Sequence, residues 1–121
     1  MDVRDTIYVG GAWIPSTGTE TIDVVNATTE EVMGRIPQGT PEDVDKAVAA
    51  AGQAFPEWAQ TSVDDRAKYL QRIAEGLQAR MEPLATLISQ EMGMPLRLSQ
   101  MIQVGLPMTT FMSMSQVLQE V

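Results

Sequence analysis

The sequence SVDDRAKYLQRIAEGLQARMEPLATLISQEMGMP, which spans residues 62–95, decides how this chain folds. Its apolar residues recur at alternating spacings of three and four, which is the pattern of a helix with one buried face. A helix interior needs an N–H group that proline lacks, so Pro83 predicts a break. The stretch therefore predicts two helices, over about 62–80 and 82–92, with Pro83 in the first turn of the second. Gly93, which tolerates a left-handed backbone, ends the second helix.

The residues before this stretch predict a small β layer and one further helix. Runs of β-branched residues separated by turn residues predict antiparallel strands within about residues 6–37. The glycine pair at 10–11 predicts a tight hairpin turn. Thr40 and Pro41 predict the N-cap and first residue of a helix over about 41–55. We therefore expect an α/β fold in which antiparallel strands are followed by amphipathic helices.

The last predicted helix, over about 96–120, has an unusually uncharged sequence. No charged residue occurs from Leu98 to Gln119, and methionine is frequent there. Pro107 should kink or split this helix. So long an uncharged surface predicts either packing on the other helices or cover by chain that is absent here. The helix lacks a basic last turn and a glycine cap before Val121, so we interpret the ending as a cut in a longer chain.

Composition excludes several classes of function. The 121 residues allow one domain at most, and 44% hydrophobic residues are typical of a globular protein. A net charge of −8 disfavours nucleic-acid binding. The absence of cysteine and histidine removes thiol nucleophiles, histidine bases and zinc sites of the Cys/His type. No signal peptide or transmembrane segment is predicted, because apolar runs are interrupted by polar residues. We expect a cytoplasmic protein.

Few residues suggest chemistry of their own. Glu91 stands out because it lies at a helix end beside Met92 and Gly93. It is a solvated carboxylate, an oxygen ligand for a monovalent cation or a hydrogen-bond anchor. The chain has no glycine-rich phosphate loop, no HExxH motif and no GxSxG motif. The residues alone therefore contain no complete active site.

Several motifs, taken in order, resemble the opening of the aldehyde dehydrogenase superfamily. They are YVGGAW at 8–13, IDVVNATTEEV at 22–32, PEDVDKAVAAA at 41–51, the helix at 66–79 and EMGMP at 91–95. The resemblance covers residues from about 7 to 121. The family usually has proline where Ala27 stands and often has lysine where Met94 stands. Neither position is catalytic in the family, so these departures point to a subfamily and not to another fold.

The resemblance implies a longer enzyme, of which this chain is the N-terminal part of a Rossmann-like NAD(P)-binding domain. Such enzymes oxidise an aldehyde to a carboxylic acid with NAD or NADP, through a cysteine nucleophile and a water activated by glutamate. The catalytic domain, with the catalytic and cofactor-contacting residues, lies outside these 121 residues, so the fragment alone should be inactive. The partners implied are the remainder of the chain, a small aldehyde, and further copies in a homo-oligomer.

The resemblance transfers only a few site residues to this chain. Val24 or Val25 is implied to offer a backbone carbonyl, and Glu91 a carboxylate, to a structural Na⁺ or K⁺ ion. Leu106 and Pro107 are implied to form a wall of the substrate tunnel.

Two alternatives to the enzyme remain open at the level of sequence. In the first alternative, the chain is a small binding or assembly module that docks its apolar 96–120 face on a partner chain. Alternatively, it is a catalytically silent remnant that has helices but no stable tertiary core.

Overall fold

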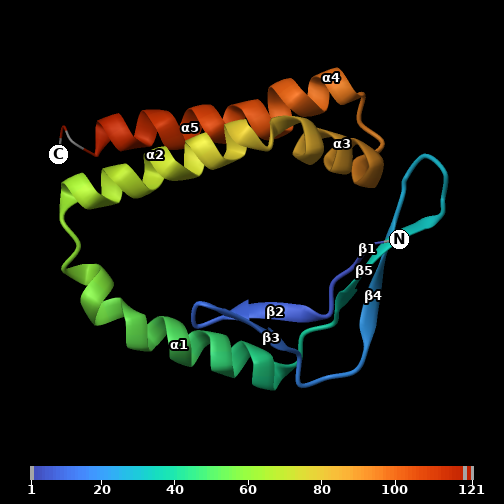
Figure 1. Ribbon diagram of the computed structural model, residues 1–121, viewed down its shortest axis with the longest axis horizontal. Helices are drawn as coiled ribbons and strands as arrows, with labels where there is room; N and C mark the ends of the chain where they lie inside the picture. Colours follow the sequence, from blue (N-terminus) through green and yellow to red (C-terminus); the bar gives the residue numbers. More distant parts are fainter. Residues whose placement is uncertain (1, 119, 121) are drawn as a thin grey trace. The chain divides into compact units, whose positions relative to one another are not determined.

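The computed structural model describes residues 2–118 and 120, which pack as two compact units (Figure 1). The first unit ends at Gln60 and the second begins at Thr61. The first unit is held by sheet and loop hydrogen bonds, whereas the second is held by helix packing.

The first unit contains two small sheets and one long helix. Its strands are β1 (Asp2–Val3), β2 (Thr6–Val9), β3 (Ala12–Pro15), β4 (Thr21–Val25) and β5 (Val32–Pro37). Strands β2 and β3 form the predicted antiparallel hairpin, and Gly10 and Gly11 turn it with φ angles of 60° and 85°. The other sheet has the order β1-β5-β4, in which β4 is antiparallel to β5 and β1 is parallel to it.

The strands predicted within residues 6–37 do pair antiparallel, but they do not form a single layer. The strands divide between two sheets, and β1 adds a parallel neighbour to β5 that the sequence did not reveal. A strand of two residues is too short to show alternation, so no pattern could predict it.

Helix α1 (Pro41–Ala59) begins where the sequence predicted. Thr40 accepts a hydrogen bond from the Asp43 N–H, and the Asp43 side chain accepts one from the Thr40 N–H, which completes a capping box. The helix runs past Pro56, so the predicted end at about residue 55 is four residues too early. One proline removes a single helix hydrogen bond, and the Gln60 N–H still closes the last turn on the Glu57 carbonyl at 3.1 Å.

The second unit is helical throughout its described residues. Its elements are α2 (Val63–Ala79), α3 (Met81–Met92), α4 (Leu96–Leu98), the π-helix η1 (Ser99–Val104) and α5 (Gly105–Val117). Ser62 caps α2 by accepting from the Asp65 N–H, and Pro83 lies in the first turn of α3. Gly93 ends α3 with a φ of 71° in the left-handed region, as predicted.

The predicted 96–120 helix is divided, but the irregularity lies before Pro107. Residues 99–104 form a π-helix, and the Gly105 N–H reaches back five residues to the Gln100 carbonyl. Pro107 is the third residue of α5, so it follows the π-helix directly and does not break α5 in its middle. Residues 119 and 121 lie outside the described residues.

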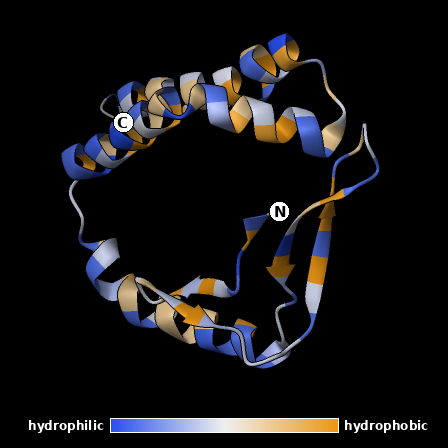
Figure 2. Ribbon diagram, turned by 45° about the vertical axis from the view of Figure 1, so that its right-hand side comes forward, coloured by the Kyte–Doolittle hydropathy of each residue, from blue (hydrophilic) through white to orange (hydrophobic). Residues whose placement is uncertain are grey.

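The fully buried apolar side chains among the described residues all belong to the second unit. They are Ala67, Ala74, Ala85 and Val104. Helix α5 runs back along α2, and η1 packs against α3 (Figure 1). Apolar and polar residues alternate along the long helices (Figure 2), yet many large apolar side chains stay exposed, Val48, Phe55 and Leu106 among them. This exposure is far more than a small globular domain normally shows to water.

Candidate functional site

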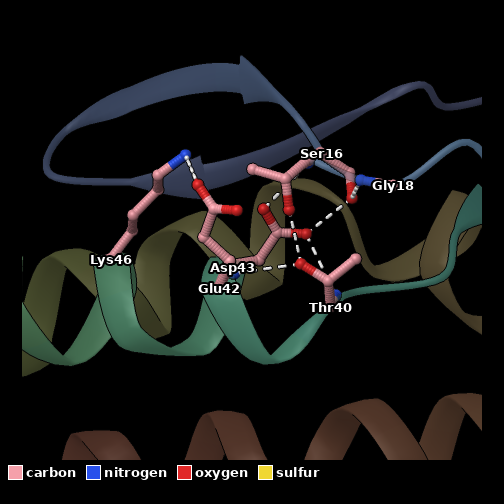
Figure 3. A network of polar contacts seen from close by, with 7 residues as sticks. Ser16, Gly18, Thr40, Glu42, Asp43 and Lys46 are labelled. Atoms are coloured by element: carbon pink, nitrogen blue, oxygen red, sulfur yellow. Dashed lines mark hydrogen bonds and ion pairs between the residues drawn. The ribbon is translucent and has the colours of Figure 1, made fainter.

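The most elaborate polar cluster in the described residues surrounds Asp43 at the start of α1 (Figure 3). The Asp43 carboxylate accepts hydrogen bonds from the Ser16 hydroxyl at 2.5 Å, the Thr17 N–H at 2.9 Å and the Thr40 N–H at 3.0 Å. Thr17 and Thr40 also share a short hydroxyl–hydroxyl hydrogen bond, and the Gly18 N–H donates to the Ser16 hydroxyl at 3.1 Å. The cluster joins the loop after β3 to the N-terminus of α1.

This cluster is a structural clamp. Asp43 is 4% exposed, and the donated hydrogen bonds of Ser16, Thr17 and Thr40 lower the pKa of its carboxyl below the usual range. A carboxylate held ionised in this way is a poor general base. The sequence predicted the capping role of Thr40 but not the participation of Ser16 and Thr17. No local signal could reveal them, because they lie more than twenty residues away in the chain.

Val24 and Val25 lie on β4, next to a distortion of the sheet. Val24 is opposite Gly34 and Val25 is opposite Val32, so the β5 residue Met33 has no counterpart on β4. A bulge of this kind disrupts the ladder locally and changes the direction of nearby backbone groups. Val24 and Val25 therefore lie where the regular hydrogen-bond ladder of the sheet is interrupted.

Glu91 is the second-last residue of α3 and is exposed to solvent. The turn that follows it is well defined, since the Ser89 hydroxyl donates to the Met94 carbonyl at 2.6 Å. Glu91 belongs to the second unit, whereas Val24 and Val25 belong to the first. No group of three or more His, Cys, Asp or Glu residues gathers anywhere in the described part of the chain. The cation site stays a prediction.

Leu106 and Pro107 occupy the first turn of α5, directly after the π-helix. The Leu106 side chain is 59% exposed, and the Leu106 carbonyl accepts a hydrogen bond from the Thr110 hydroxyl at 2.9 Å. A π-helical turn often marks a functional position, because it changes the direction of the residues that follow. The sequence anticipated an irregularity here but attributed it to Pro107 alone.

A groove of about 540 Å³ lies within the first unit, between the β2–β3 hairpin and α1. Its walls are mainly small or apolar and include Gly10, Ala50 and Ala54, and the polar ends of Tyr8 and Gln53 also line it. A ligand site normally combines an apolar wall with several convergent polar groups, which this groove lacks.

No helix in the described part of the chain is both long and apolar enough to span a membrane.

Comparison with known proteins gives consistent matches. The family model described as "Aldehyde dehydrogenase family" matches residues 13–121. A curated Staphylococcus epidermidis protein that carries the name aldehyde dehydrogenase is 44% identical over 101 residues, which are 82% of this chain and 21% of that protein.

Solved structures match over almost the whole chain. An aldehyde dehydrogenase from Bartonella henselae superposes with a TM-score of 0.96 at 28% identity, covering 100% of this chain and 25% of that one. Aldehyde dehydrogenase C from Pseudomonas syringae, solved as a mutant with NAD⁺ and octanal, superposes with a TM-score of 0.92 at 37% identity, covering 95% and 24%. The chain thus spans about a fifth to a quarter of the length of the relatives that it matches.

Proposed function

This chain belongs to the aldehyde dehydrogenase family, and we propose that it is the N-terminal part of an enzyme that oxidises an aldehyde to a carboxylic acid with NAD or NADP. The observation that carries the proposal is the family match over residues 13–121, together with the superposition of the chain on solved enzymes of that family. The family match favours the enzyme over the alternative of a small binding or assembly module.

The catalytic groups must come from other residues than these. The chain contains no cysteine, so it cannot supply the thiolate that attacks the aldehyde carbon in the reaction that the resemblance implies. Its contribution to the enzyme is therefore structural and steric: it supports the cofactor-binding domain and shapes part of the path to the site. The described residues do this through the Asp43 clamp in the first unit and the α2–α5 packing in the second.

The described residues do not fit a dinucleotide either. Gly10 and Gly11 turn a hairpin between two strands, whereas a phosphate loop leads from a strand into a helix. Asp43 and Asp65 lie in the first turns of α1 and α2, where their negative charges oppose a phosphate group. We therefore assign NAD(P) binding to the rest of the enzyme.

The experiment that tests the proposal compares this chain with the product of the whole reading frame. We would sequence the coding DNA past Val121 and measure the intact mass of the native protein. The complete enzyme should show an aldehyde-dependent rise in NADH or NADPH absorbance, and the purified 121-residue chain should show none. A stop codon after Val121 with a native mass of 13.2 kDa would overturn the proposal for this molecule. Activity of the chain alone would overturn the assignment of catalysis to other residues.

We further propose that Glu91 offers its carboxylate to a structural Na⁺ or K⁺ ion and, as a separate proposal, that Val24 or Val25 offers a backbone carbonyl to such an ion. The bulge beside Val24 and the exposure of Glu91 support this, and oxygen ligands suit a hard cation. The thermal midpoint of the complete enzyme should be higher in NaCl or KCl than in choline chloride of equal concentration. Glu91→Gln should abolish that difference, whereas Glu82→Gln, an exposed change in the first turn of the same helix, should preserve it. An unchanged difference in the Glu91→Gln enzyme would contradict the site.

Family resemblance also supports a cytoplasmic homo-oligomer. A free catalytic thiolate needs a reducing compartment, and the members of the family are usually dimers or tetramers. Size-exclusion chromatography with light scattering would measure the assembly, and a monomeric complete enzyme would contradict it.

A further inference from the structure

We draw no further inference here: the strongest candidate, the exposed apolar stripe that Val44, Val48 and Phe55 form along α1, carries nothing because no contact in the described part of the chain shows what covers it.

Discussion

At the scale of single residues, Asp43 illustrates how one carboxylate can serve two structures at once. It completes the capping box of α1 and receives the Ser16 hydroxyl and the Thr17 N–H from a loop far away in the chain. A helix cap normally takes its hydrogen bonds from residues close to it in the sequence, and a loop is normally held by hydrogen bonds within its own turns. Because Asp43 joins the two, it couples the start of α1 to the end of the β2–β3 hairpin.

Asp43→Asn should destabilise the fold in a way that depends on pH. The hydrogen bonds lower the pKa of Asp43 in the folded chain, so its ionisation stabilises the fold. That stabilisation is fully present above the unfolded pKa of about 4 and is lost as the pH falls further toward the folded pKa. At pH 7 the variant of the complete enzyme should have a thermal midpoint several degrees lower, and the deficit should shrink below about pH 4.

Glu42 provides the matched control for that measurement. It lies in the same turn of α1, and its carboxylate makes an exposed ion pair with Lys46 at 3.0 Å. Exposed pairs contribute little to stability, so Glu42→Gln should barely change the midpoint at either pH. Equal thermal midpoints for the Asp43→Asn variant and the unmodified enzyme at pH 7 would show that the hydrogen bonds of Asp43 add nothing to the stability of the fold.

At the scale of elements, two glycines mark where helices end and begin. Gly93 ends α3 in the left-handed region, and Gly105 follows the π-helix with the Gln100 carbonyl only 3.1 Å from where a Cβ would lie. Both glycines allow the chain to change direction at places where a side chain would be strained or crowded. Together they determine where α3 stops and how α5 starts.

Gly93→Ala should destabilise the fold by about 1 kcal/mol, because a non-glycine residue is strained at a φ of 71°. Gly52→Ala should instead stabilise the fold, since Gly52 lies inside α1 with open space where a Cβ would lie. The free energy of unfolding should rise by roughly 0.5–1 kcal/mol in this variant, because alanine has the higher helix propensity. Urea unfolding of the complete enzyme would measure both, and destabilisation of equal size by both changes would contradict the role of the left-handed cap.

At the scale of the whole molecule, the chain buries little of its apolar surface. The buried apolar residues in the described part are three alanines and one valine, whereas long side chains such as Phe55, Met101 and Leu106 are exposed. Alanine contributes little hydrophobic free energy, so the packing of α2 on α5 is close but modest in energy. This distribution agrees with a chain that spans 21–25% of the relatives it matches.

The sequence by itself determined the features that depend on local chemistry. Neighbouring residues were enough to predict the helix starts at Thr40 and Ser62, the break before Pro83 and the hairpin turn at Gly10 and Gly11. The family followed from the order of motifs along the whole chain. Caps, turns and proline breaks involve atoms a few positions apart, so the sequence that forms them is also the sequence that reveals them.

Only the tertiary structure decided the contacts that link distant residues. The partners of Asp43, the pairing of β1 with β5 and the burial of Ser99 against Ala85 join positions 14 to more than 30 residues apart. Their energies depend on where other elements place a hydroxyl, a strand edge or a carbonyl, which no local pattern encodes. The same reason applies at the start of α5: the sequence predicted an irregularity at Pro107, but the burial of Ser99 and Val104 and the hydrogen bond from Ser99 to the Ala85 carbonyl are tertiary contacts of the π-helix.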